Sequence, residues 1–136
     1  MKWDIVVEKW LARLFADDAL ISLLDGRKIF AASANRPVKV PSVEWLMMYD
    51  TEGEWLNPVG FQVDIFARGV RMAAQMERRI RLLTHHDTSQ DFSGERMWFL
   101  YQDARSIEFP SDPGVVHRAL DFECQSVRAK YVSLGA

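Results

Sequence analysis

The chain has 136 residues, of which 49% are hydrophobic and 26% are charged, the balance of an ordinary folded domain and not of a disordered chain. The 17 Lys and Arg residues nearly balance the 19 Asp and Glu residues, and the net charge of -2 excludes a strong overall attraction to nucleic acid or to an anionic membrane. The length favours a single domain over residues 1–136. The opening MKWDIVVEKW is too charged for a signal peptide, so we expect the protein in the cytosol of the cell that makes it.

Two helices are predicted near the N-terminus. The first has an apolar stripe at helical spacing, formed by Trp3, Val7, Trp10 and Leu14. Such a stripe is expected to cover a sheet. Asp17 and Asp18 then supply a capping signal before the apolar run ALISLL, and Gly26 is expected as the left-handed stop of this short second helix.

An antiparallel hairpin is predicted next, after a brief strand at Ile29 and Phe30. The segments SVEWLMMY and VGFQVDIFA are β-rich, and TEGEWLNP between them supplies turn residues. The second strand alternates, with Val59, Phe61, Val63, Ile65 and Ala67 on one face. Gln62 and Asp64 are therefore expected on the opposite face, away from the core.

The segment GVRMAAQMERRIRLLTHH predicts the clearest amphipathic helix of the chain. Its apolar residues fall within about a third of the helix circumference and are Met72, Ala73, Met76, Ile80 and Leu83. Arg71, Arg78 and Arg81 project from the far side of this helix.

The C-terminal third predicts two long strands after a polar loop, HHDTSQDFSG. The strands ERMWFLYQDARSIEF and VVHRALDFECQSVRAKYV are joined by PSDPG, a strong turn signal. The predicted element order is α-α-β-β-β-α-β-β, with strands in hairpins and not in βαβ units. This order favours an α+β fold, an antiparallel sheet covered on one face by the N-terminal helices and the long amphipathic helix.

No arrangement of residues points clearly to catalysis, a metal or a cofactor. The sequence has no phosphate-binding glycine loop, zinc-protease helix or nucleophile elbow. Adjacent His85, His86 and Asp87 would point apart on an extended loop, and Cys124, the single cysteine, lies in the apolar pattern of a strand. We therefore predict a protein that is not an enzyme, with no cofactor. The alternative is a small-ligand-binding or enzymatic α+β domain in which Asp64 and His117 meet in a pocket.

Two features favour a protein that assembles with other subunits. Trp45, Trp55 and Trp98 give more aromatic strand surface than one small core needs, and such surface often lies in an interface. The arginine-bearing helix also carries Glu77, so a solvated or subunit-contacting face is favoured over a nucleic-acid site. The candidate subunit-interface residues are Trp55, Gln62, Asp64, Arg71, Arg78 and Arg81.

The order and spacing of four segments resemble the tail-terminator, or tail-completion, family of long-tailed bacteriophages and phage-like particles. The segments are DDALISLLDGRKIF, the proline-containing crossover to PSVEW, QVDIFARG followed directly by the helix VRMAAQMERRIRLL, and the closing strand with HRALDFE. The resemblance extends over nearly the whole chain, and the hairpin tip DTEGEWLNP departs from the family's pattern.

The resemblance implies a structural virion protein that forms a six-membered ring at the head-proximal end of the tail tube. Its implied partners are copies of itself, the major tail tube protein and a head–tail connector or neck protein, with DNA only passing through the lumen. It implies no catalytic residues and no membrane partner. Another neck or connector subunit is the alternative within the same class.

Overall fold

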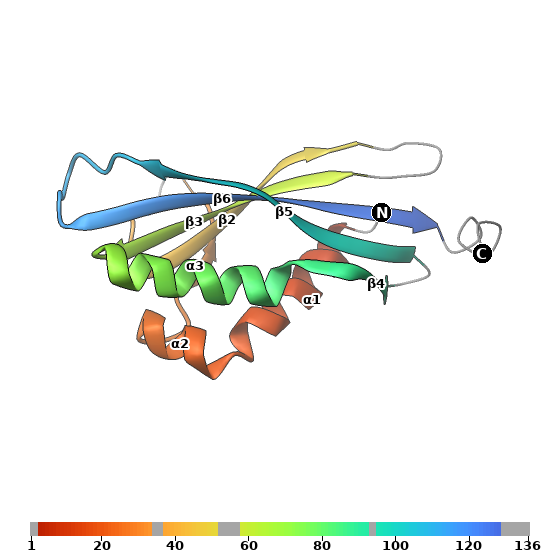
Figure 1. Ribbon diagram of the computed structural model, residues 1–136, viewed down its shortest axis with the longest axis horizontal. Helices are drawn as coiled ribbons and strands as arrows, with labels where there is room; N and C mark the ends of the chain where they lie inside the picture. Colours follow the sequence, from red (N-terminus) through yellow and green to blue (C-terminus); the bar gives the residue numbers. More distant parts are fainter. Residues whose placement is uncertain (1–2, 34–36, 52–57, 93–94, 129–136) are drawn as a thin grey trace.

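The computed structural model describes residues 3–33, 37–51, 58–92 and 95–128 (Figure 1). The elements in chain order are α1 (Trp3–Phe15), α2 (Asp18–Leu24), β1 (Ile29–Ala31), β2 (Ser42–Asp50), β3 (Val59–Arg68), α3 (Val70–Thr84), β4 (His86–Phe92), β5 (Glu95–Ile107) and β6 (Val115–Arg128). None of the helices among these residues is long and apolar enough to cross a membrane.

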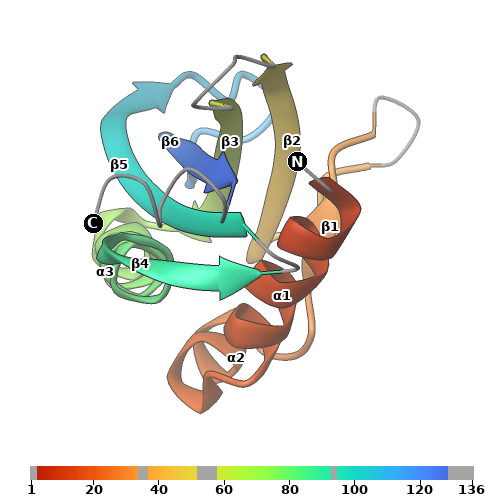
Figure 2. The same cartoon turned by 90° about the vertical axis from the view of Figure 1, so that its right-hand side faces the viewer.

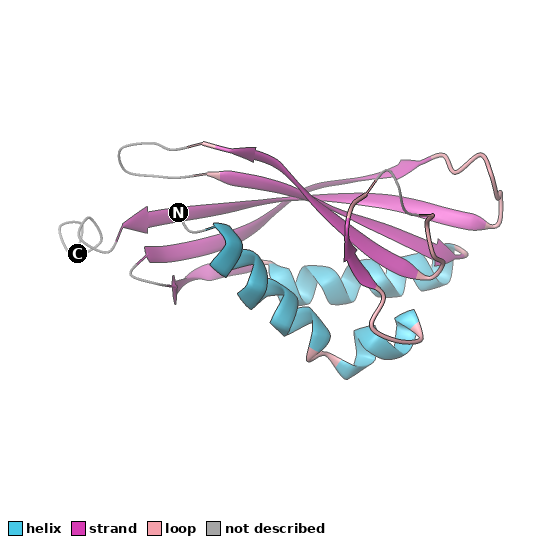
Figure 3. Ribbon diagram, turned by 180° about the vertical axis from the view of Figure 1, so that it is seen from behind, coloured by secondary structure: helices cyan, strands magenta, loops and turns pink. Residues whose placement is uncertain are grey.

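The six strands form one sheet in the order β1-β2-β3-β6-β5-β4. Strand β1 runs parallel to β2, and the other neighbouring pairs are antiparallel. The three helices lie on the same side of this sheet (Figures 1 and 3). The predicted α+β fold is therefore confirmed, including the antiparallel hairpins and the cover of one face by helices.

The predicted brief strand at Ile29 and Phe30 is confirmed as β1, but one element differs from the expected order and β1 differs in its pairing. The segment predicted as a polar loop is strand β4, which pairs with β5 at the edge of the sheet. Backbone groups make the hydrogen bonds of such a pair, so an edge strand forms without the apolar alternation that marks an inner strand. The short strand β1 also adds a parallel pair with β2, which no hairpin pattern predicts.

The ends of α2 show one correct and one shifted prediction. Asp17 is the N-cap, and its carboxylate accepts a hydrogen bond from the Leu20 N–H at 3.0 Å. The left-handed C-terminal residue is Asp25, with φ 53°, and not Gly26. Gly26 follows with φ 128°, and its N–H bonds to the Ile21 carbonyl at 3.1 Å, which completes a Schellman-type end.

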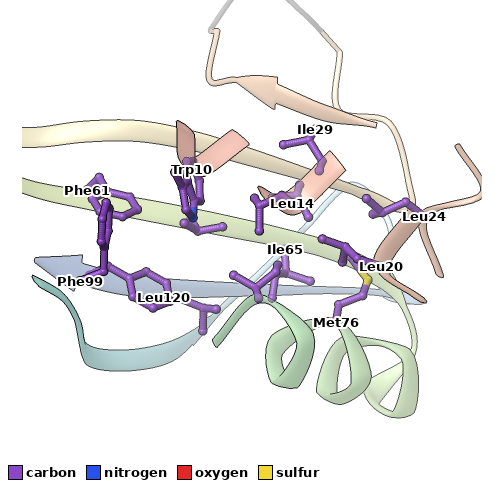
Figure 4. Packing of buried hydrophobic residues seen from close by; sticks show 14 of the residues in the cluster. Trp10, Leu14, Leu20, Leu24, Ile29, Phe61, Ile65, Met76, Phe99 and Leu120 are labelled. Carbon is purple, nitrogen blue, oxygen red and sulfur yellow. The ribbon is translucent and has the colours of Figure 1, made fainter. Parts of the chain in front are cut away.

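The core lies between the helices and the covered face of the sheet (Figure 4). Trp10 of α1 contacts Phe61 of β3 edge-on at 5.1 Å between ring centroids, and Phe61 stacks on Phe122 of β6 at 5.6 Å. The Trp10 indole N–H donates to the Thr84 hydroxyl at 2.9 Å, which joins α1 to the end of α3. The predicted helix stripe is confirmed, because Ala73, Met76 and Ile80 are all buried.

The opposite face of the sheet, called the outer face below, is not covered by any of the described helices. It carries Gln62, Asp64, Arg105, His117 and Asp121, whose positions follow from strand register. The prediction that Gln62 and Asp64 lie away from the core is confirmed. Asp64 is nevertheless buried, with 7% of its surface exposed, and its carboxylate contacts Gln62 of β3 and His117 of β6. Local alternation identifies the face but not this burial.

Candidate interaction surfaces

A continuous chain of polar contacts crosses the outer face. His117 Nε2 lies 2.8 Å from Asp64 Oδ1, and the Gln62 amide donates to both oxygens of Asp64 at 2.9 and 3.0 Å. Arg105 donates to the Gln62 carbonyl at 2.6 Å and to Asp121 at 2.5 Å. These bonds join strands β3, β6 and β5. The Asp64 carboxylate is therefore contacted both from its own strand, β3, and from β6.

An aromatic stack extends this network toward the turn between β5 and β6. The rings of Phe66 and His117 stack at 4.3 Å, and Phe66 meets Phe109 edge-on at 5.8 Å. The Phe66 ring therefore contacts the face of the His117 imidazole, and the Asp64 carboxylate contacts its edge. This fixed position is typical of a structural histidine and is also what a catalytic histidine requires.

Asp64 and His117 meet, as the enzymatic alternative requires. In a hydrolytic triad, the same histidine also contacts a nucleophile such as a serine or cysteine. Among the described residues, the hydrogen bonds of His117 include Asp64 but none of these side chains. No three His, Cys, Asp or Glu side chains in the described ranges gather closely enough to hold a metal ion.

A groove lies elsewhere, between α3 and β5, and has a volume of about 540 Å³. We call it the arginine groove; its lining includes Glu77, Arg78, Arg81, Leu82, His85 and Tyr101. Figure 2 shows α3 beside β4 and β5 at this side of the molecule. Neither Asp64 nor His117 lines the groove, so it is not the pocket that the enzymatic alternative predicts.

Two contacts shape the arginine groove. The Arg81 guanidinium lies over the Tyr101 ring at 3.9 Å, and His85 Nδ1 accepts a hydrogen bond from the Tyr101 backbone N–H at 3.0 Å. Glu77 receives two bonds from Arg118, at 2.9 and 3.0 Å, so its charge is already matched. The groove therefore presents positive charge from Arg78 and Arg81 beside exposed Leu82.

The structure separates the predicted interface residues into two groups on opposite sides of the sheet. Gln62 and Asp64 lie on the outer face and bond to each other, whereas Arg78 and Arg81 line the groove and Arg71 is exposed on the same helix. Trp55 lies outside the described residues. A contact of any of these residues with another subunit stays a prediction.

Sequence reasoning missed Arg105, Asp121 and Glu123 on the outer face and Tyr101 in the groove. A signal was available for part of this set. Asp121 and Glu123 alternate with the predicted core residues Leu120, Phe122 and Cys124, so they had to lie on the other face of the same strand. Their meeting with Gln62 and Arg105 depends on strand order, which alternation does not give.

Comparisons with known proteins concern the sequence and the fold. No protein-family model and no curated protein sequence matches the chain. Its fold is shared by a chain of a solved virion. That structure is the virion of a native gene transfer agent particle, and the two chains align with a TM-score of 0.65 and 13% identity. The alignment covers 87% of this chain and 91% of that one, so the likeness concerns the whole fold.

Proposed function

We propose that the chain is a structural virion protein, a tail terminator that forms a ring at the head-proximal end of a phage-like tail tube. The observation that carries this proposal is the fold shared with a chain of a gene transfer agent virion over 87% of the present chain. The resemblance of its segments to the tail-terminator family supports the same conclusion.

The surfaces of the protomer suit such a role. A growing tube offers the same surface to each new ring, so its growth has no intrinsic end. A terminating ring must match the tube on one side and present different chemistry on the other, toward the neck. Here the two sides of the sheet differ, with a hydrogen-bonded polar network on one and the arginine groove on the other, and such unlike surfaces suit a heterologous contact between neighbours around a ring. The partners would be the tail tube protein and a neck protein, with the hairpin tip from Thr51 to Pro58 on the ring-contact side.

Deletion of the gene from its native particle tests this function by electron microscopy. Loss of a terminator should give filled heads without tails, together with tubes of uncontrolled length. Loss of a neck or connector subunit should instead give tails of normal length that are not attached. Normal tails joined to heads would contradict both assignments.

The contact of 2.8 Å between Asp64 and His117 supports a second candidate function, that of a small-ligand-binding or enzymatic domain. It predicts an activity in broad hydrolase, nuclease or phosphatase screens that Asp64→Asn and His117→Ala both remove. Arg27→Gln, at an exposed position on the helix side, is the matched control. The structural proposal predicts that the wild-type protein is inactive in all of these screens.

A further inference from the structure

The exposed face of α3 combines positive charge with apolar surface. Arg71, Arg78 and Arg81 are all exposed, and no carboxylate among the described residues pairs with them. Leu82, which lines the arginine groove with Arg78 and Arg81, is 61% exposed. Their neighbours on the helix behave differently, because Arg79 pairs with Asp17 and Glu77 pairs with Arg118. Arg79 and Glu77 of α3 are therefore paired with charges of other elements, whereas Arg71, Arg78 and Arg81 are exposed.

The outer face carries a complementary excess of carboxylates. Asp103 of β5 lies directly opposite Asp121 of β6, and Glu123 follows two residues along β6 on the same face. Like charges directly opposite each other on neighbouring strands are destabilising. Arg105 pairs with Asp121, but Asp103 is exposed and has no hydrogen bond or ion pair within the described part of the chain. We call Asp103, Asp121 and Glu123 the carboxylate patch.

We propose that the arginine groove of one copy receives the carboxylate patch of the next copy. This inference rests on the ring of the proposed function and names the contact that builds it. The groove lies on the helix-covered side of the sheet and the patch on the outer face, so one copy cannot join the two. A contact between two different surfaces is heterologous, and repetition of a heterologous contact closes into a ring when the rotation allows.

The arginine groove offers this contact both positively charged side chains and apolar surface that can be buried. Arg78 and Arg81 would meet carboxylates, and a guanidinium binds a carboxylate through two parallel hydrogen bonds. Leu82 and the Tyr101 ring would be covered at the same time. Within one copy Asp121 already pairs with Arg105 and Glu123 accepts a hydrogen bond from Tyr49, so Asp103 is the carboxylate of the patch that gains most from a guanidinium of the next copy.

Charge-swap variants test the contact. The groove variant is Arg78→Glu with Arg81→Glu, and the patch variant is Asp103→Lys with Glu123→Lys. Controls that change the same charge at exposed sites elsewhere are Lys9→Glu with Lys39→Glu, and Glu8→Lys with Asp18→Lys. Each protein is studied alone and in equimolar mixtures by sedimentation velocity, after circular dichroism has shown that it is folded. Asp103→Lys alone is the fallback if the Glu123 substitution disturbs folding.

We expect the wild type and both controls to self-associate with increasing concentration. Each swapped variant should associate about a hundredfold more weakly, because like charges would then face each other. Mixing the two swapped variants should restore association, since each supplies the charge that the other has lost. A mixture that does not recover, or swapped variants that associate like the wild type, would overturn the contact.

Weak association is captured by carbodiimide, which couples a carboxylate to an amine that touches it. In Arg78→Lys with Arg81→Lys, a mixture of isotope-labelled and unlabelled chains should give mixed-label crosslinks from the groove to the patch. A monomeric protein without such crosslinks contradicts the proposal. Binding of a DNA oligonucleotide that needs Arg78 and Arg81, without self-association, would replace it with a nucleic-acid site. The deletion phenotype is read independently, so either proposal can fail while the other stands.

Discussion

Asp17 combines two roles that the sequence shows only in part. Its carboxylate caps α2 through the Leu20 N–H and also pairs with Arg79 of α3, at 2.5 Å. Hydrogen bonding to Arg79 holds the pKa of the Asp17 carboxyl below its ordinary value, although partial burial acts in the opposite sense. The cap was predicted from local sequence, whereas the pair with a residue 62 positions away was not.

Asp17→Ala should therefore lower the free energy of unfolding at neutral pH by about 1–2 kcal/mol, mainly through the lost cap. The folded protein binds this proton more weakly than the unfolded chain, so the stabilisation is complete above the unfolded pKa of about 4 and is lost as the pH falls through the folded value. Urea denaturation should show that the difference in free energy of unfolding between wild type and variant becomes smaller as the pH is lowered. Asp18→Ala, one residue away and exposed, should cost less and show less pH dependence.

Tyr49 reaches across β3 on the outer face and donates to the Glu123 carboxylate of β6. Its ring lies over Gly60, where an added Cβ would stand only 2.1 Å from the ring, so glycine is required for this crossing. Partial burial, followed by the neighbouring Glu123 charge, raises the pKa of Tyr49 to about 12.

Glu123→Gln should lower the pKa of Tyr49 toward the ordinary tyrosine value of about 10, without reaching it, because the burial remains. Ultraviolet absorbance titration of tyrosinate measures this shift, and Tyr49→Phe identifies the group. Glu108→Gln, at an exposed position, is the control and should leave the titration unchanged. An unchanged Tyr49 pKa in Glu123→Gln would show that burial alone sets it.

Among the elements, α1 is joined to α3 by a buried hydrogen bond from Trp10 to Thr84 and by a partly buried one from Arg13 to the Leu83 carbonyl. Thr84→Val removes the acceptor of the Trp10 indole N–H but keeps the side-chain shape. The unpaired buried donor should cost about 1–3 kcal/mol of unfolding free energy, measured by chemical denaturation. Trp10→Phe should lower the free energy of unfolding by less in the Thr84→Val variant than in the wild type, because in that variant the indole N–H has already lost its acceptor. Equal costs in the two backgrounds would show that the bond contributes nothing measurable.

The elements that sequence predicted well have strong local periodicity. The apolar stripe predicted helix α3, and the alternation predicted strand β3. The same alternation predicted the face on which Gln62 and Asp64 lie. Strand β4 was missed because its sequence, HDTSQDF, has no apolar alternation, and its state depends on the free edge of β5. The contact of Asp64 with His117 depends on the register of β3 against β6, which are separated by α3, β4 and β5 along the chain. No local pattern encodes that register.

For the whole molecule, the proposed head-to-tail contact makes assembly dependent on ionic strength. Raising the salt from about 0.1 M to about 1 M shortens the screening length from about 10 Å to about 3 Å. Self-association through the arginine groove and carboxylate patch should weaken over this range in sedimentation experiments, with thermal unfolding followed as a control for stability. Association that strengthens with salt would indicate a contact formed mainly by apolar surface.

The central position of Cys124 gives the protein an internal reporter of core opening. The thiol is fully buried on β6, in register with Val59 of β3 on one side and Phe99 of β5 on the other. Its side chain belongs to the core on the covered face of the sheet. A thiol reagent can reach it only when that core opens, so the ratio of its modification rate to that of a free thiol measures the equilibrium for that opening. Incorporation into a ring that holds the sheet closed should slow the modification, and the ratio of the two rates would report how much an assembled neighbour stabilises each protomer.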